Sequence, residues 1–335
     1  MELYLDSADI NEIREVSKFG FITGLTTTPT FMHRHGITDV DAAIVELSKL
    51  VDVLQIEALG SNAEEIVKEA YRQEALGLDR KKTVYKIPIS MEGVKACRQL
   101  VNEGFLVNIH LVYTLQQAYM AMQAGATYVC PLVGRLQDEG HDALALVEQC
   151  VDAVNYYKYN TKIMFSSVRN AEHVRNAINL GTHTVTVPWK IMKQLTENNF
   201  TTIGTQQFEE HTRLMTVKVG DAIRDKNPIV KSNYTIADCL VQMSSGGFGA
   251  VSIVDDENAA IGFFSDGDLR RFLEKGGDIK RTLKQSITLK KPLTISSDEL
   301  LFKAHEVFNL HKVDELVVIN KENKVVGMLD VQDLV

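Results

Sequence analysis

The sequence predicts an α/β chain in two parts: a (β/α)8 TIM barrel over residues 1–212, followed by a smaller α+β domain over residues 213–335. Three observations support this prediction. A chain of 335 residues is too long for one ordinary domain. As far as about residue 210, short apolar runs alternate with longer amphipathic stretches, which is typical of parallel βα units. Beyond that point an internal repeat replaces the alternation.

Eight candidate strands lie in the first part, and helix-like segments separate them. The strands are expected at residues 2–5, 21–23, 53–56, 83–87, 106–109, 128–130, 162–165 and 184–187, with helices such as 63–74, 91–103, 115–124 and 142–156 between them. Eight units in roughly 210 residues fit a barrel near the lower limit of its usual length. The alternative is an open doubly wound sheet, but no Gly-x-Gly-x-x-Gly motif follows the first strand.

Composition and charge exclude several classes of protein. The net charge is −8, from 36 basic and 44 acidic side chains, which argues against a nucleic-acid surface. The four cysteines form no Cys-x-x-Cys pair and read as reduced thiols. The first residues lack the regions of a signal peptide, and no segment approaches the ~20 apolar residues that cross a bilayer. We expect a cytoplasmic protein with no nucleic-acid or membrane partner.

The chemically informative residues fall at the C-terminal ends of the predicted strands, the face on which barrel enzymes build their active sites. They are Asp6, Thr28, Glu57, Lys86, Asn108, His110, Arg135, Ser167 and Arg169. Lys86 is unusual because it lies inside the apolar segment 84–88. Desolvation in such a segment favours the neutral amine. A neutral lysine amine can attack a carbonyl group and form a Schiff base.

Several motifs of this first part resemble the transaldolase family, and in particular its short fructose-6-phosphate aldolase branch. They are Met1–Asp6, Gly24-Leu-Thr-Thr-Thr-Pro29, Lys86-Ile-Pro88, Met91-Glu-Gly93 and Pro131-Leu-Val-Gly-Arg135. The similarity covers almost all of residues 1–212, with the motifs in the family's order. It implies a (β/α)8 barrel and a lysine Schiff base that makes or breaks the C3–C4 bond of a phosphorylated ketose. It implies no metal and no cofactor for catalysis.

The resemblance also implies a role for individual positions. Lys86 matches the Schiff-base lysine, Asp6 the carboxylate that moves protons at the sugar hydroxyls, and Glu57 the acid that helps to hold the catalytic water. Arg135 and Arg169 match the phosphate-binding arginines, whose planar guanidinium groups suit phosphate. Ser167 matches a contact to phosphate or hydroxyl, and Asn108 is expected beside the substrate.

Three positions depart from the family pattern. Thr28 stands where the family has an asparagine that binds a substrate hydroxyl or the carbinolamine, and we keep it as a substrate-binding candidate. His110 replaces the threonine that polarises the catalytic water, and Leu132 replaces an aromatic residue. A histidine at the water position can shuttle protons near neutral pH. It is equally consistent with a step remodelled for another substrate, or impaired.

Each candidate also has a simpler interpretation. Lys86 can extend from a strand end to a carboxylate. Asp6 can be the N-cap of a helix beginning near Ile10. His110 can be a hydrogen-bonded core histidine, and Arg135 and Arg169 can be surface ion-pair partners.

The second part contains two similar segments. Residues 249–262 are echoed by residues 314–327, and each copy continues into an Asp-Leu pair at 268–269 and 333–334. A helical stretch precedes each copy, at 235–244 and 298–310. Each copy is therefore predicted to be one structural unit that packs against the other copy.

This part resembles a tandem CBS domain pair, and is closest to the pair that ends arabinose-5-phosphate isomerases. In the segment Gly262-Phe-Phe-Ser-Asp-Gly-Asp-Leu-Arg-Arg271, the resemblance assigns phosphate to Ser265 and ribose to Asp268. The second copy keeps Asp333 but has Asp330 at the hydroxyl position, which would repel a phosphate. We expect one working nucleotide site, for an adenine nucleotide, another nucleotide or a nucleotide sugar. The alternative is a pair that serves only as a dimerisation surface.

Two hypotheses about function follow. The first is a transaldolase- or aldolase-like enzyme that forms a Schiff base with a sugar phosphate and is regulated by a nucleotide at the CBS pair. The second is a barrel that is catalytically altered or inactive and serves as a nucleotide-sensing or scaffold protein. Both resemblances imply a homo-oligomer.

Overall fold

A computed structural model describes residues 1–334 of the chain. The chain divides into two compact units, Met1–Glu197 and a second unit that begins at Asn198. The predicted boundary between residues 212 and 213 lies inside helix α11 (Asn199–Thr216), which groups with the second unit.

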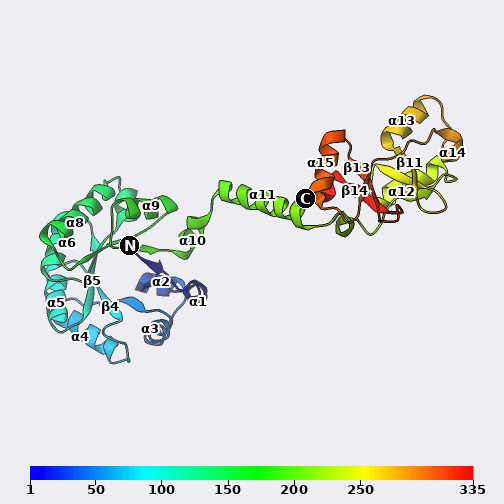
Figure 1. Ribbon diagram of the computed structural model, residues 1–335. Coiled ribbons are helices and arrows are strands. Elements are labelled where there is room, and N and C mark those ends of the chain that lie inside the picture. Colours follow the sequence, from blue (N-terminus) through cyan, green and yellow to red (C-terminus); the bar gives the residue numbers. More distant parts are fainter. Residues whose placement is uncertain (335) are drawn as a thin grey trace. The chain divides into compact units, whose positions relative to one another are not determined.

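Eight parallel strands form a closed barrel in the first unit, in the sequential order β1 to β8 (Figure 1). This confirms the predicted (β/α)8 fold. The strands are β1 (Glu2–Asp6), β2 (Gly24–Thr26), β3 (Val53–Glu57), β4 (Thr83–Pro88), β5 (Leu106–Val112), β6 (Tyr128–Pro131), β7 (Lys162–Phe165) and β8 (Thr184–Val187).

Helices surround this barrel in Figure 1. They are α1 (Ile10–Ser17), α2 (Pro29–Arg34), α3 (Val40–Ser48), α4 (Ala63–Glu74), α5 (Met91–Asn102), α6 (Leu115–Gln123), α7 (Val133–Asp138), α8 (Ala143–Tyr157), α9 (Ala171–Asn179) and α10 (Trp189–Met192), followed by the 3-10 turn η1 (Lys193–Thr196). Local sequence sets many of their starts: Asn62, Ser90, Thr114 and Asn170 each accept a backbone N–H of the first turn. Aliphatic residues between helices and strands form the main core.

The barrel interior holds a second, smaller cluster. It contains Tyr4, Val84, Tyr128, Cys130, Leu132 and Met164. The hydroxyl oxygens of Tyr4 and Tyr128 lie 3.0 Å apart within it, so the barrel is a filled core and not a pore.

One predicted strand and one alternative interpretation are wrong. The second strand is Gly24–Thr26 and not residues 21–23. Phe21 is 66% exposed, whereas Gly24 pairs with β3 so closely that a Cβ atom would lie 2.2 Å from the carbonyl oxygen of Val53. In addition, Asp9 and not Asp6 caps helix α1, because its side chain accepts the N–H groups of Asn11 and Glu12.

The second unit contains two three-stranded sheets of the same design, which confirms the predicted repeat pair. Their elements are β9 (Ile229–Lys231), α12 (Ile236–Gly246), β10 (Ala250–Val254), β11 (Ala260–Ser265), α13 (Asp266–Glu274) and α14 (Leu283–Ser286), then β12 (Thr294–Ser296), α15 (Leu301–His311), β13 (Glu315–Ile319), β14 (Val325–Asp330) and the 3-10 turn η3 (Val331–Leu334). In each sheet the middle strand pairs parallel with one neighbour and antiparallel with the other.

The core of the second repeat includes residues that precede the first repeat. Val219, in the 3-10 turn η2 (Val219–Ala222), is fully buried in one cluster with Ile295, Leu301 and Leu316. Its N–H group donates to the carbonyl oxygen of Glu299 at 2.8 Å. The first repeat is therefore inserted between two segments that share one core.

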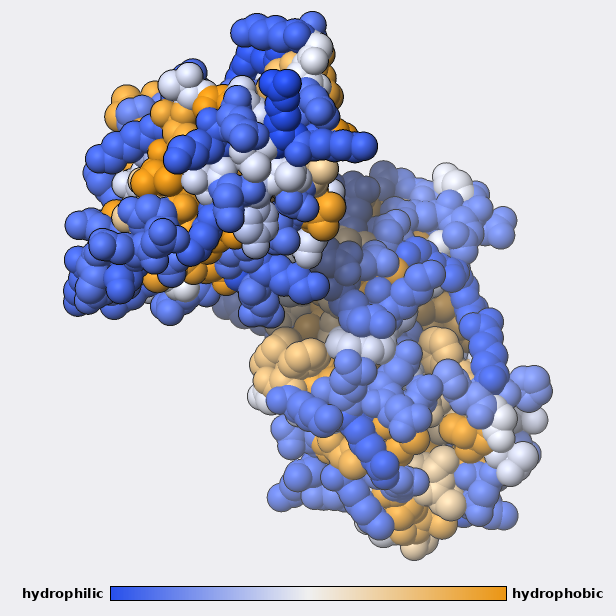
Figure 2. Space-filling model, turned by 90° about the vertical axis from the view of Figure 1, so that its right-hand side faces the viewer, coloured by the Kyte–Doolittle hydropathy of each residue, from blue (hydrophilic) through white to orange (hydrophobic). Residues whose placement is uncertain are grey.

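The outer surface carries both polar and apolar side chains, as the face in Figure 2 shows. Over residues 1–334, no helix combines the length and the hydropathy that a membrane span requires.

Candidate active site

Lys86 lies at the centre of a buried polar cluster at the C-terminal ends of the barrel strands. It belongs to β4, pairs with Glu57 on β3 and with Asn108 on β5, and is only 5% exposed. Its Nζ atom lies 3.0 Å from Glu57 Oε1 and donates a hydrogen bond of 3.1 Å to the carbonyl oxygen of Thr27. The lysine thus points into the barrel mouth and does not extend to the surface.

Glu57 connects Lys86 to His110. Its second oxygen, Oε2, lies 2.9 Å from His110 Nε2. Burial alone would raise the pKa of Glu57, but Lys86 and His110 outweigh this effect and hold the pKa below its usual value. Burial lowers the pKa of His110, against the opposing pull of Glu57. A neutral imidazole beside an ionised carboxylate is therefore favoured.

A local irregularity in β5 accompanies the placement of His110. The pairing of β5 with β6 shifts register between Ile109 and Val112. Leu111, within this bulge, has a φ of 56°, in the left-handed region that a leucine rarely adopts. Bulges and strained residues of this kind re-aim side chains at functional sites.

Asp6 lies at the end of β1 and completes the carboxylates of the mouth. Its Oδ1 atom accepts a hydrogen bond of 2.8 Å from Thr26 Oγ1. Withdrawal of the carboxyl group from water raises the pKa of Asp6, although Lys86 and Thr26 act in the opposite direction. Two carboxylates beside one lysine therefore have pKa values displaced in opposite directions.

Asn108 and Gln55 form a fully buried amide pair below this cluster. Asn108 Nδ2 donates to Gln55 Oε1 at 2.7 Å. Sequence reasoning missed Gln55 and Thr27. The available signal for Gln55 was its position two residues before Glu57, on the same face of the strand.

Several buried polar atoms at the mouth have no hydrogen-bond partner within residues 1–334. They are Thr27 Oγ1, Gln55 Nε2 and Asn108 Oδ1. Among the described residues, Glu57 Oε2 and His110 Nε2 contact only each other, at 2.9 Å. Native interiors rarely tolerate such atoms without a ligand or ordered water. The mouth is thus equipped to bind a molecule rich in hydroxyl groups.

Arg135, Ser167 and Arg169 lie together at the ends of β6 and β7. Gly134 allows this close approach: a Cβ atom there would lie 2.1 Å from the carbonyl oxygen of Ser167 and 2.8 Å from Arg169 Nε. Ser167 has a φ of 60°, again in the left-handed region. Gly134 and the conformation of Ser167 thus bring Arg169 against helix α7, which carries Arg135.

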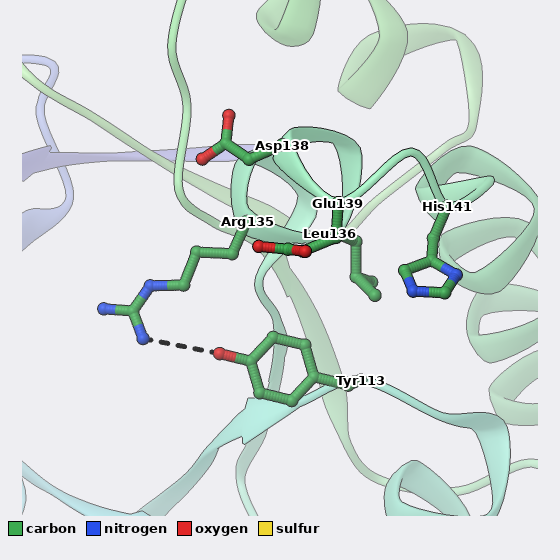
Figure 3. Close-up of a pocket in the computed structure, with 6 residues that line it drawn as sticks. All are labelled: Tyr113, Arg135, Leu136, Asp138, Glu139 and His141. Carbon is green, nitrogen blue, oxygen red and sulfur yellow. Dashed lines mark hydrogen bonds between the residues drawn. The ribbon is translucent and has the colours of Figure 1, made fainter.

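A cavity of about 370 Å³ opens beside Arg135 (Figure 3). It is lined by Tyr113, Arg135, Leu136, Asp138, Glu139 and His141. Arg135 Nη1 points toward Tyr113 and donates to its hydroxyl group at 3.4 Å. Arg169 Nη2 forms an ion pair of 3.0 Å with Asp138.

Thr28 has a structural role in the chain itself. It is the N-cap of α2, and its Oγ1 atom accepts the N–H of Phe31 at 3.3 Å. Leu132 is part of the apolar interior.

In the second unit, Ser265 and Asp268 satisfy one another. Ser265 caps α13 and donates from Oγ to Asp268 Oδ2 at 2.8 Å, while the N–H of each residue is directed to the side chain of the other. The other oxygen of Asp268 accepts from Arg271 at 2.7 Å. Burial would raise the pKa of Asp268, but Arg271 and Ser265 hold it below its usual value.

Asp333 in the second copy is also engaged. Its Oδ2 atom accepts the N–H of Asp330 at 2.9 Å, and Oδ1 pairs with Arg224 Nε at 2.7 Å. Nearby, burial together with Asp330 raises the pKa of Glu315, which accepts the N–H of Gly249 at 3.0 Å.

The first unit is thus a (β/α)8-barrel protein whose Lys–Glu–His cluster lies at the end of the barrel where enzymes of this fold work. A family model described as Transaldolase/Fructose-6-phosphate aldolase matches residues 3–232. The chain belongs to the transaldolase/fructose-6-phosphate aldolase family. The prediction of a transaldolase- or aldolase-type enzyme is confirmed at this level.

Curated relatives carry the same assignment. A probable transaldolase of Thermoanaerobacter sp. (strain X514) is 37% identical over 220 residues, which cover 65% of this chain and 100% of the relative. A probable transaldolase of Desulforudis audaxviator is 38% identical over 209 residues, or 62% of this chain and 95% of the relative. Each relative is matched over nearly its whole length by less than two thirds of this chain.

The CBS domain model matches residues 219–275 and 284–335, which confirms the predicted CBS pair. Among solved structures, a CBS domain protein from Pyrobaculum aerophilum complexed with AMP aligns with 18% identity and a TM-score of 0.32, over 35% of this chain and 89% of that protein. A CBS domain pair in complex with 5-methylthioadenosine and S-adenosyl-L-methionine aligns with 19% identity and a TM-score of 0.31, over 35% and 92%. The likeness to arabinose-5-phosphate isomerases stays a prediction.

Proposed function

We propose that the barrel is a Schiff-base enzyme that makes or breaks the C3–C4 bond of a phosphorylated ketose, and that the CBS pair regulates it by binding a nucleotide. The observation that carries the proposal is the buried Lys86 amine, 3.0 Å from Glu57, at the mouth of the barrel. A lysine in this position is shielded from water and has a proton acceptor within reach.

In the proposed reaction, Lys86 Nζ attacks the ketone carbon C2, and loss of water gives a protonated imine. The C3–C4 bond then breaks as its electron pair moves toward the imine. The C4 hydroxyl group loses its proton to Asp6, and the aldehyde fragment leaves. Because its pKa is raised, Asp6 is a stronger base than an ordinary aspartate. The remaining enamine either attacks a second aldehyde, whose oxygen takes the proton back from Asp6, or takes up a proton itself. In both cases water then hydrolyses the resulting imine and frees the Lys86 amine.

Glu57 and His110 are assigned to the water that enters and leaves during these steps. The buried Oε2 and Nε2 atoms, 2.9 Å apart, can together bind one water molecule or hydroxyl group. With its lowered pKa, the His110 ring is neutral, and because its Nε2 atom faces the ionised Glu57 carboxylate it keeps its proton on that nitrogen. His110 is therefore assigned as the donor to that water, and Glu57 as the proton acceptor.

Binding of the substrate is assigned to residues around the cluster. Asn108 Oδ1, which has no partner in the described chain, is an acceptor for a sugar hydroxyl group. Thr28 flanks the mouth through its position after β2. Arg135, Arg169 and Ser167 are assigned to the phosphate group, for which guanidinium groups provide charge and directed N–H donors.

Regulation is assigned to the first CBS copy, with Ser265 at the phosphate and Asp268 at the ribose, and Asp333 at the corresponding position of the second copy. The carboxylate of Asp330 disfavours an anion in the second copy. The same negative charge contributes to the raised pKa of Glu315. One nucleotide per chain is therefore expected. A homo-oligomer remains our expectation for the assembly.

The alternative of an inactive barrel has less support. The lysine, both carboxylates and the histidine converge, and polar atoms around them lack partners in the described chain. Burying charged side chains destabilises the folded state through desolvation. In an inactive barrel no function would offset this loss of stability.

The experiment that tests the proposal is borohydride reduction with a panel of ketose phosphates and dihydroxyacetone, followed by intact-mass measurement and peptide mapping. A stable adduct on Lys86 is expected, and its loss in Lys86→Met. Lys82→Met is the matched control, because Lys82 is exposed just before the same strand. Retained trapping in Lys86→Met, or no adduct with any donor, would contradict the Schiff-base assignment.

A further inference from the structure

The two arginines assigned to the phosphate group are held in different ways. Arg135 donates to the neutral hydroxyl group of Tyr113 at 3.4 Å, whereas Arg169 pairs with the carboxylate of Asp138 at 3.0 Å. Arg169 reaches Asp138 by crossing Gly134, where its Nε atom would lie 2.8 Å from an added Cβ. The guanidinium group of Arg169 therefore runs along helix α7 toward a competing anion.

We infer that Asp138 is a specificity-determining residue: it occupies Arg169 in the free protein and so weakens the binding of phosphate-bearing ligands. This inference rests on the proposed assignment of Arg135 and Arg169 to the phosphate group. A phosphate dianion that uses both arginines must displace Asp138 from Arg169 or bind beside its negative charge.

The exposure of the pair suits it to exchange. The side chains of Arg169 and Asp138 are 52% and 59% exposed, so water compensates each partner when they separate. A buried pair would resist displacement, because separation would leave a charge without a partner. Asp138 can therefore hold Arg169 against α7 in the free protein, and the ion pair can break when a ligand of higher charge binds Arg169.

Asp138 differs from the other carboxylate at this site. Both residues line the cavity, but in Figure 3 the carboxylate of Asp138 points away from the Tyr113 ring. Among the ion pairs of the described residues, Arg169 is joined to Asp138 and not to Glu139. Glu139 is thus a control for the general effect of negative charge near the cavity.

The test uses inorganic phosphate as the probe on the full-length protein, with calorimetry for binding and with inhibition of the reaction measured in parallel. Asp138→Asn is expected to bind phosphate about two- to fivefold more tightly, the change that corresponds to an exposed ion pair. Glu139→Gln is expected to change the affinity less. KM for a phosphorylated substrate should fall in Asp138→Asn, while kcat/KM for the unphosphorylated donor dihydroxyacetone stays the same.

The outcomes separate this inference from the proposed function. Binding that is lost in Arg169→Met but unchanged or weakened in Asp138→Asn would overturn the inference and leave the phosphate site in place. An equal gain in Glu139→Gln would also overturn it, since charge alone would then explain the effect. If no variant bound phosphate, the assignment of the arginines and this inference would both fail.

Discussion

The barrel mouth and the CBS pair differ in what their polar side chains have left to bind. At the mouth, Thr27, Gln55 and Asn108 are buried and keep atoms without a partner in the described chain. In the CBS pair, Ser265 and Asp268 are engaged with each other and with Arg271.

This difference separates preformed sites from sites that must rearrange. A ligand at the mouth supplies the hydrogen bonds that the buried polar atoms lack. Its binding therefore removes the free-energy penalty of leaving those atoms unpaired. A nucleotide at the CBS pair has to replace hydrogen bonds that already exist, and gains only the difference. A motif names the residues of a site but does not say whether their atoms are free.

The largest effect is expected for Lys86→Met. Removing the amine should lower kcat by at least about a thousandfold, as losses of a nucleophile do, and it leaves Glu57 without its cationic partner. Turnover of the best donor identified by trapping is the measurement. Activity within tenfold of the original protein would place the chemistry elsewhere.

Asp6→Asn should separate activity from stability. Its kcat is expected to fall by roughly 10²–10⁴, the usual contribution of a general base. A carboxyl group with a raised pKa binds its proton more tightly in the folded state, so its contribution to stability is present at acid pH and is lost as the pH rises through the folded-state pKa.

Asparagine carries no charge at any pH, so the Asp6→Asn variant should melt at a higher temperature than the original protein at pH 8. The advantage should vanish at pH 3.5. Thermal unfolding at the two pH values measures it. A variant that is less stable at pH 8 would show that the Asp6 carboxylate stabilises the mouth.

Gly134→Ala should weaken the phosphate side of the mouth. The new methyl group would collide with the carbonyl oxygen of Ser167, which costs about 1–3 kcal/mol as overpacking does, and moves Arg169. KM for a phosphorylated substrate is expected to rise. Gly204→Ala is the matched control: it lies in helix α11 with nothing within 4 Å of the new methyl group, and should stabilise by up to about 1 kcal/mol.

The smallest effect is expected for Ser265→Ala. Loss of the N-cap of α13 should lower the free energy of unfolding by about 1 kcal/mol. Ser244→Ala, at an exposed position within α12, should change it by a few tenths at most. Denaturant unfolding of both variants decides whether the capping hydrogen bonds are as strong as their geometry indicates.

Much of the barrel was predictable because its determinants are local. Apolar runs, caps and strand ends can be read along the sequence, and seven of the eight strands overlap their predicted positions. The second strand was misplaced because Phe21-Ile-Thr23 is apolar enough for a strand. The need for glycine at position 24 comes from the close backbone of Val53, 29 residues later in the chain, and no local pattern shows it.

The positions of the candidate residues were predictable, but their partners were not. Lys86, Glu57 and His110 were expected at one face because parallel strands end together. The pairing of Asn108 with Gln55 spans 53 residues, and that of Arg224 with Asp333 spans 109. Such pairs are set by tertiary packing, and no local sequence pattern predicts them.

The insertion of the first CBS repeat has a consequence for the order in which the chain can fold during its synthesis. Val219 leaves the ribosome early, but the strands and helix that bury it, including Ile295, Leu301 and Leu316, follow more than 70 residues later. Closing that loop is slow compared with forming local helices. The barrel can therefore fold while the segment around Val219 is still exposed to solvent, because the residues that bury Val219 have not yet been synthesised.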